Sequence, residues 1–228
     1  MTALRVTSRT RDIKVDDKQL ATLDLAPLAN APKLRSVYVR APKLTELDLS
    51  PLAGLPVERV VLVLEGVGEL DLSPLAASPT LAELVLAKAP PRLDLAPLAG
   101  CRALHDLMIY DTAISELDLG PLDAVPMLRI VWLSSTAMTS LDLRPLAQLP
   151  ELRAVDLSKS KLARVELGDK PGFAALTHLH LHDNPLAALD LAPLAPGTFL
   201  RVLNLPAGLE VDLSMLPAPN KKFEINFR

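Results

Sequence analysis

The sequence predicts an α/β solenoid: a right-handed horseshoe with a concave parallel β-sheet of about ten strands and short helical or 3-10 turns on its convex side. The first observation is a phrase close to LDLxPLA, which occurs nine times at spacings of 22 to 24 residues. The second is a short alternation of apolar and polar residues ahead of each copy. Such a period is typical of one structural unit per repeat, stacked so that neighbours bury a common core.

Composition and continuity indicate a single domain. Half of the 228 residues are hydrophobic but only 3% are aromatic, as expected for a core made of many small layers of Leu, Val and Ala. Because the period is unbroken, we expect one domain over residues 1–228, with an N-terminal cap at 1–12 and a C-terminal capping strand at 219–228.

Each repeat begins with a predicted β-strand. In the copy from Leu176 to Phe199, Leu179 and Leu181 alternate with outward-facing histidines, which is the period of two that marks a strand. The segment from Phe223 to Phe227 continues the same register. Aligning the repeats gives these inward-facing pairs: Ile13/Val15, Val37/Val39, Val60/Leu62, Leu84/Leu86, Leu107/Ile109, Val131/Leu133, Val155/Leu157, Leu179/Leu181 and Leu203/Leu205.

The LDLxPLA phrase predicts the return of the chain along the convex side. Its proline suits the first position of a short helical turn, where a missing N–H is harmless, and Ser50 and Ser73 stand where an N-cap would. The segment from Gly168 to Gly172 departs from the phrase and predicts a convex bulge.

An acidic residue occupies the same place in every phrase. We expect each carboxylate to accept N–H groups at the start of the following turn. A calcium ladder is the alternative, although the usual glycine-rich calcium repeat is missing. The acidic residues are Asp24, Asp48, Asp71, Asp94, Asp118, Asp142, Glu166, Asp190 and Asp212.

One copy carries a recognisable family motif. Its first half reads Leu176-x-x-Leu179-x-Leu181-x-x-Asn184-x-Leu186, which resembles the signature of leucine-rich repeats. Its second half is similar to internalin-like bacterial repeats, with a unit about two residues longer. The resemblance implies the horseshoe fold and leaves the function open.

The chain departs from this family at the asparagine position. Family asparagines there form a buried ladder of hydrogen bonds to neighbouring backbones, and only Asn184 matches in this chain. Buried backbone groups must still be paired, so we expect irregular or hydrated loops after the strands in the N-terminal half. The other residues at this position are Lys18, Pro42, Glu65, Ala89, Thr112, Thr136, Ser160 and Gly208, of which Thr112, Thr136 and Ser160 are partial substitutes.

The outward positions of the strands contain the only Trp and both Tyr of the chain. With nearby Val, Ile and Met they predict an apolar strip over the third to sixth strands, and exposed strips rich in these residue types mark protein interfaces. Alternatively, the residues pack on one another and stabilise the sheet. The predicted partner-binding residues are Tyr38, Arg40, Arg59, Val61, Val63, Val85, Met108, Tyr110, Ile130 and Trp132, with Leu64 in the same strip and Glu83, Asp106 and Asp111 setting the orientation.

Two further groups of residues are candidate sites. The first group is a row of alternating histidines on one strand face, His178, His180 and His182, with Asp156 and Asp183 nearby. They could be zinc ligands, but a flat strand spreads such ligands apart. We therefore favour a polar, pH-sensitive end of the binding face. The connecting segment that carries Cys101 offers no low-pKa setting for a thiol, and no phosphate-binding glycine loop is found. The sequence therefore predicts no catalysis, cofactor or metal.

Net charge, the Cys count and the lack of long apolar segments limit which partners and which cell compartment are expected. The formal net charge of −3 argues against nucleic acid. A single Cys fits a reducing compartment, the N-terminus lacks the apolar run of a signal peptide, and no stretch approaches the ~18 apolar residues of a membrane span. Richness in Ala, Leu, Pro and Arg is typical of GC-rich bacterial genomes.

We therefore expect a cytoplasmic, monomeric bacterial protein that binds another protein through the concave sheet, as an inhibitor or immunity protein or as an adaptor. Two alternatives remain open. One is a metal- or pH-responsive binder that uses the histidine strand, and the other is an exported effector.

Overall fold

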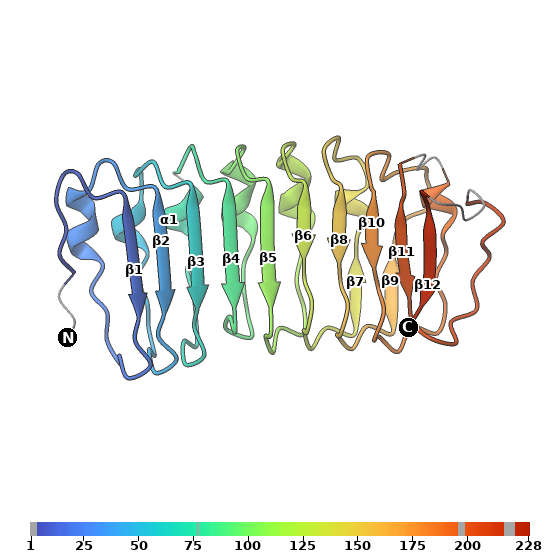
Figure 1. The fold of residues 1–228 in the computed structure, drawn as a ribbon, viewed down its shortest axis with the longest axis horizontal. Coiled ribbons are helices and arrows are strands. Elements are labelled where there is room, and N and C mark those ends of the chain that lie inside the picture. Colours follow the sequence, from blue (N-terminus) through green and yellow to red (C-terminus); the bar gives the residue numbers. More distant parts are fainter. Residues whose placement is uncertain (1–3, 77, 196–198, 217–221) are drawn as a thin grey trace.

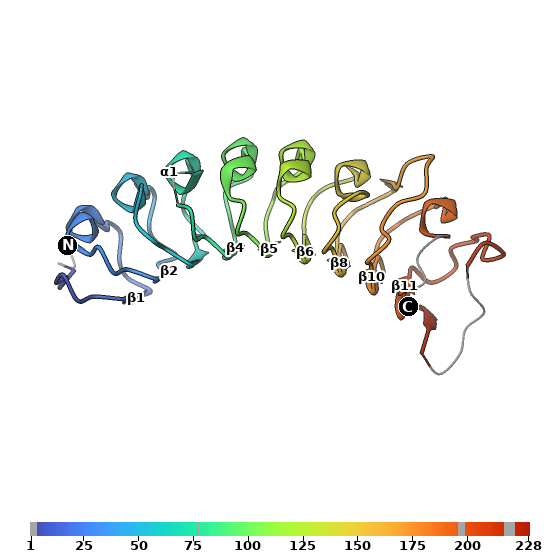
Figure 2. The same cartoon turned by 90° about the horizontal axis from the view of Figure 1, so that it is seen from above.

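A computed structural model describes residues 4–76, 78–195, 199–216 and 222–228 of the chain. Ten strands lie side by side and point the same way (Figure 1) in a single parallel sheet of order β1-β2-β3-β4-β5-β6-β8-β10-β11-β12. Viewed from above, the sheet follows the inner side of an arc and the helical turns follow the outer side (Figure 2). The predicted solenoid with a concave sheet is confirmed. The strands are β1 (Asp12–Asp16), β2 (Ser36–Arg40), β3 (Arg59–Val63), β4 (Glu83–Ala87), β5 (Asp106–Tyr110), β6 (Ile130–Trp132), β8 (Ala154–Asp156), β10 (His178–His180), β11 (Val202–Leu205) and β12 (Glu224–Phe227).

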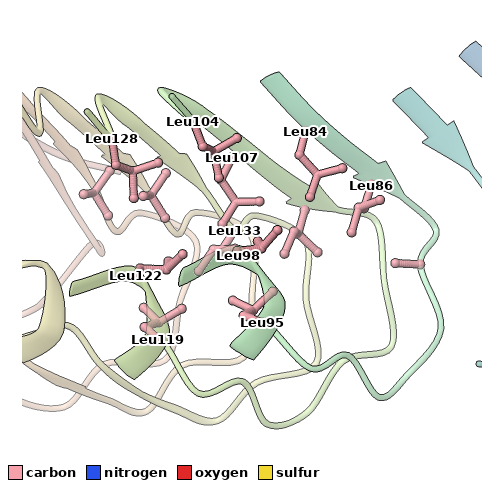
Figure 3. Close-up of a cluster of buried hydrophobic side chains, with 14 of the residues drawn as sticks. Leu84, Leu86, Leu95, Leu98, Leu104, Leu107, Leu119, Leu122, Leu128 and Leu133 are labelled. Atoms are coloured by element: carbon pink, nitrogen blue, oxygen red, sulfur yellow. The ribbon is translucent and has the colours of Figure 1, made fainter. Parts of the chain in front are cut away.

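The register is also as predicted. Val37 pairs with Ile13 on one side and with Val60 on the other, and the same alignment continues to Leu203 opposite Ile225. Every predicted inward residue of the first nine strands is at most 9% exposed, and leucines of successive repeats meet in one continuous core (Figure 3). The inward pattern is less well buried only in the last strand, β12, where Phe227 is 47% exposed.

Segments at both ends of the described chain pack onto the solenoid. Leu4 and Val6 pack against the core ahead of β1, and β12 adds the tenth strand beside β11. Of the segments predicted as caps, residues 1–3 and 219–221 lie outside the described part of the chain. No helix in the described part is long and apolar enough to cross a membrane.

Short helical turns line the convex side. In each of them the proline of the repeated phrase is the second residue, because its fixed φ suits the first turn of a helix. They are one short α-helix, α1 (Ser73–Ala76), and the 3-10 turns Ala26–Asn30, Ser50–Leu52, Ala96–Gly100, Gly120–Ala124, Arg144–Leu146 and Ala192–Leu194.

The acidic column caps these turns, as predicted. Asp48 Oδ1 accepts the Ser50 N–H at 2.8 Å, and Asp94 Oδ1 accepts the Ala96 N–H at the same distance. Six further aspartates repeat the contact, whereas Glu166 is paired with Arg164 instead. The expected Ser50 N-cap is wrong: Leu49 is the N-cap residue, without a side-chain cap. The capping oxygen belongs to Asp48, and hydrogen bonds from Ser50 hold the pKa of Asp48 below its ordinary value.

Two convex features fall outside the repeated pattern. A second, two-stranded sheet, which the sequence did not predict, joins β7 (Ser140–Asp142) to β9 (Arg164–Glu166). The repeat that follows β9 has no helical turn in the described residues, which confirms the irregularity at Gly168–Gly172. Buried Phe173 fills the core there, and Gly172 passes so close to Ala147 that an added Cβ would lie 2.8 Å from the Ala147 Cβ.

Among the described residues, the asparagine position forms a ladder of side-chain hydrogen bonds to the backbone from the fifth repeat to the eighth. Asn184 accepts the Leu162 N–H at 3.0 Å and donates to the carbonyls of Leu157 and Leu181 at 2.9 Å each. Ser160 Oγ accepts the Thr136 N–H at 3.0 Å, and the Thr112 hydroxyl donates to Ala89 O at 2.9 Å. These hydroxyls are the partial substitutes that the sequence predicted.

The turn before this position also divides the chain. From the fourth repeat to the eighth, a non-glycine residue with φ between 52° and 57° precedes the ladder position, whereas the first three repeats have no such residue. The loops of the N-terminal repeats therefore depart from the later pattern. The left-handed residues are Lys88, Asp111, Ser135, Lys159 and Asp183.

Candidate protein-binding surface

The centre of the concave sheet presents an aromatic pair. Trp132 lies on β6 with 40% of its surface exposed, and its ring centroid is 6.0 Å from that of Tyr110 on β5, at an interplanar angle of 35°. The indole Nε1–H donates to the hydroxyl of Ser134, a residue that is otherwise buried. Because Tyr110 and Ser134 both restrain the indole, little conformational entropy is left to lose when a partner covers it.

The apolar strip around this pair is narrower than predicted. Three predicted residues are half-buried on the concave face of the sheet and so offer some area to a partner: Val63, Met108 and Ile130. Val61 and Val85 also lie in outward register, but they are only 7% and 6% exposed. These two valines therefore support the surface and offer almost no area to a partner.

Leu64 does not belong to the strip, and its predicted outward position is wrong. It is 1% exposed and packs in the core. In later repeats the residue that directly precedes the ladder position has a left-handed backbone conformation and turns its side chain outward, as at Lys88. The first three repeats lack that conformation, so Ala41 and Leu64 pack inward instead.

The N-terminal strands carry the charged residues of the prediction. Lys14 Nζ lies 5.5 Å from the ring centroid of half-buried Tyr38. Arg59 Nε is 2.8 Å from Glu83 Oε2, whereas exposed Arg40 forms no ion pair with any described residue. Arg40 is thus the predicted charge most available to a partner.

Two acidic residues predicted to set the orientation lie beside the aromatic pair. Asp106, at the start of β5, is 3.2 Å from His105 Nδ1. Asp111 follows β5 and is exposed in a left-handed turn. Both therefore border the same surface as Tyr110.

The three predicted histidines form a row of neighbouring rings at the other end of the sheet, one pair tilted and the other edge-to-face. The ring centroid of His180 is 6.1 Å from those of His178 and His182. The Asn226 amide donates to Asn204 Oδ1 at 3.0 Å, and Asn204 Nδ2 lies 2.6 Å from His180 Nδ1. Because an amide nitrogen only donates, His180 Nδ1 accepts and the ring proton is assigned to Nε2. Within the described residues, no three His, Cys, Asp or Glu side chains are placed to hold a metal ion.

The surroundings of His180 predict a lowered pKa for its ring. Burial lowers the pKa of His180 from its ordinary value of 6.5, and Asp156 only partly offsets the effect. Since the charged form is disfavoured in the fold, His180 should cost stability as the pH falls below 6.5, the value in the unfolded chain. NMR titration should give His180 a pKa below 6.5, and Asn204→Ala should raise it by removing the donor to the neutral ring. An unchanged pKa in Asn204→Ala would contradict the assigned tautomer.

Cys101 is structural. It is buried, burial raises the pKa of its thiol to about 11, and its Sγ lies 3.5 Å from the Leu75 carbonyl oxygen as a weak donor. A thiol with this pKa is protonated at neutral pH and is therefore a poor nucleophile.

Sequence reasoning missed the residue that precedes each strand. This position is rich in exposed arginine and forms one edge of the concave sheet. The repeat spacing of 22 to 24 residues would have revealed it, had the alignment been read one residue ahead of the strand.

The parallel concave sheet, the convex turns and the partial asparagine ladder define a leucine-rich-repeat fold. No protein-family model matches the sequence. No curated protein matches it either. Solved structures share the fold, which confirms the resemblance to internalin-like repeats at that level.

Three structures illustrate the likeness. Internalin C2 of Listeria monocytogenes is 20% identical, with a TM-score of 0.62 over 90% of this chain and 81% of the internalin. A leucine-rich-repeat protein of Leptospira interrogans is 18% identical, with a TM-score of 0.64 over 95% of this chain and 60% of its own. The plant peptide hormone receptor RGFR1, in complex with RGF2, is 20% identical, with a TM-score of 0.62 over 82% of this chain and 30% of the receptor.

Proposed function

We propose that this protein binds another protein through its concave sheet and does so without catalysis. The observation that carries the proposal is the exposed Trp132 beside Tyr110, held by Ser134 at the centre of the sheet. Buried hot spots of interfaces are enriched in Trp and Tyr. Core packing does not explain the two rings, because the inward positions of β1 to β11 are filled by aliphatic residues.

Known complexes of this fold support a protein or peptide ligand. The receptor RGFR1 was solved bound to RGF2. A rigid curved sheet suits this task, since a preformed surface loses little entropy on binding.

The role we propose is that of a cytoplasmic, monomeric bacterial inhibitor, immunity protein or adaptor. The single Cys of the chain, which leaves no internal disulfide to form, supports a reducing compartment. Neither nucleic acid nor a membrane is part of this proposal. An exported effector that uses the same sheet is the alternative, and localisation of a tagged full-length chain separates the two.

A second candidate function is pH-responsive binding at the histidine end of the sheet. It is favoured by the relay from Asn226 through Asn204 to His180, which protonation of His180 Nδ1 would disrupt. If partner affinity does not change between about pH 5 and pH 7, this candidate is ruled out.

Site-specific photo-crosslinking tests the main proposal. A benzophenone amino acid replaces Met108 on the concave sheet or, as a control, exposed Met215, which lies in the last convex phrase outside the sheet. Irradiation of producing cells should yield a discrete adduct with another protein from position 108 and none from position 215. An adduct formed only from position 215, or equally from both, would place the interface elsewhere.

A further inference from the structure

The residues that precede the strands form a regular column along one edge of the concave sheet. This is the edge from which the arrows start in Figure 1. Backbone hydrogen bonds fix the column: the Arg35 N–H donates to Arg11 O at 2.6 Å, and the Arg153 N–H donates to Arg129 O at 2.9 Å. Neighbouring members are therefore about 4.8 Å apart. In sheet order from β1 to β11 they are Arg11, Arg35, Glu58, Ala82, His105, Arg129, Arg153, Thr177 and Arg201.

The column is strongly basic in an acidic protein. Five arginines and one glutamate give it a formal charge of +4 with His105 neutral, although the whole chain carries −3. All five arginines are exposed. Like charges on adjacent strands repel, so the arrangement works against the stability of the sheet.

The fold itself does not require these arginines. The acidic column has a structural task, because eight of its nine carboxylates accept the N–H of a turn. The basic column has no comparable task, since Glu58, Ala82 and Thr177 occupy the same position with the same backbone bonds.

Internal ion pairs compensate the column only in part. Arg35 is 2.6 Å from Glu58, while Arg129 and Arg153 share Glu151 at 3.8 and 3.4 Å. Arg11 and Arg201 form no ion pair with any described residue. At the centre of the edge, two guanidinium groups thus compete for one carboxylate.

We propose that this arginine column recognises acidic side chains of the protein that occupies the concave sheet. The inference rests on the proposed function and adds the chemistry of the partner. Arg129 precedes Trp132 by three residues, so its Cα lies roughly 10 Å from that of Trp132. The surface of the partner that fits this site therefore carries carboxylates about 10 Å from an apolar side chain. Arginine suits this task because its planar group binds carboxylates in a bidentate manner.

The charges beside the column favour a protein over a nucleic acid. Glu83 and Asp106 stand at the first outward position of β4 and β5, next to the column, and Glu58 and Glu151 lie on the edge itself. A phosphate backbone, whose affinity depends on many unopposed cations, would meet these four carboxylates. A protein surface presents both signs of charge and accommodates them.

Selection from a displayed library of random dodecapeptides tests this inference on the full chain. The wild type should enrich peptides that combine Asp or Glu with aromatic or aliphatic residues. The selected acidic peptides should bind Arg129→Glu/Arg153→Glu roughly 10-fold to 100-fold more weakly, the effect of losing a charge-assisted contact. The control Arg92→Glu, an exposed arginine of a convex segment, should retain wild-type affinity.

The outcomes separate this inference from the proposed function. If the peptides selected by the wild type are apolar without enrichment in Asp or Glu, and their binding depends on Trp132, the acidic-partner inference is wrong while the concave site stands. If no peptide distinguishes the wild type from Trp132→Ala/Tyr110→Ala, the proposed function itself fails. Tight binding of a 20-nucleotide single strand or duplex at physiological salt would overturn the choice of a protein partner. Should the double charge reversal misfold by circular dichroism, Arg11→Glu/Arg201→Glu, which breaks no internal ion pair, replaces it.

Discussion

Replacing both Trp132 and Tyr110 by alanine is expected to weaken partner binding by about 100-fold to 1000-fold, or ~3–4 kcal/mol. The two rings are in contact, so their effects should not add independently. The free protein should lose only about 1 kcal/mol of stability, the usual contribution of an aromatic pair, because neither ring belongs to the inner core.

Titration calorimetry with the protein retrieved by crosslinking provides the measurement. Met215→Ala is the matched control, since Met215 is 57% exposed but lies in the last convex phrase outside the sheet, and it should bind as the wild type does. A folded double variant with undiminished affinity would remove the concave sheet from the interface.

Replacing Asn184 by alanine should have the largest effect on stability of any single ladder residue. The change leaves the Leu162 N–H and the carbonyls of Leu157 and Leu181 without their partner inside the solenoid. Unpaired buried backbone groups are costly, so we expect a loss of about 2–4 kcal/mol. Ser160→Ala should cost less, because its hydroxyl serves fewer backbone groups.

Urea unfolding followed by circular dichroism measures this loss. The control is Lys161→Ala, an exposed side chain next to Leu162, which should change the free energy of unfolding by less than about 0.5 kcal/mol. A loss below about 1 kcal/mol in Asn184→Ala would mean that water replaces the amide at little cost.

The repeat period was enough to predict the fold and the register. Once one copy was aligned on Leu179 and Leu181, the period of two settled which residues of every other strand point inward. The phrase also predicted the capping aspartates, because a carboxylate two residues ahead of a helical turn has free N–H groups within reach.

Accessibility within the site was harder to predict. Outward register does not imply exposure, since Val61 and Val85, whose register partners on the flanking strands are Tyr38 and Met108, are only 7% and 6% exposed. The inward turn of Leu64 depends on a backbone conformation that its own repeat lacks. Serine at position 50 looked like an N-cap only because the helical turn was expected to start one residue later.

The arginine column was missed for a different reason. A strand pattern is read from its alternating residues, and the column lies just ahead of them. Its meaning depends on the whole stack, because Arg129 and Arg153 become neighbours only when β6 pairs with β8.

The single thiol of the chain also has a practical consequence. Cys101 is buried beneath the convex turns and protonated at neutral pH, so it should not react with maleimides or disulfide reagents. Any cysteine introduced on the surface then becomes the sole reactive handle, without prior removal of the native one. A fluorophore at position 130 and another at position 201 of separate samples would thus report occupancy of the sheet and of its edge independently.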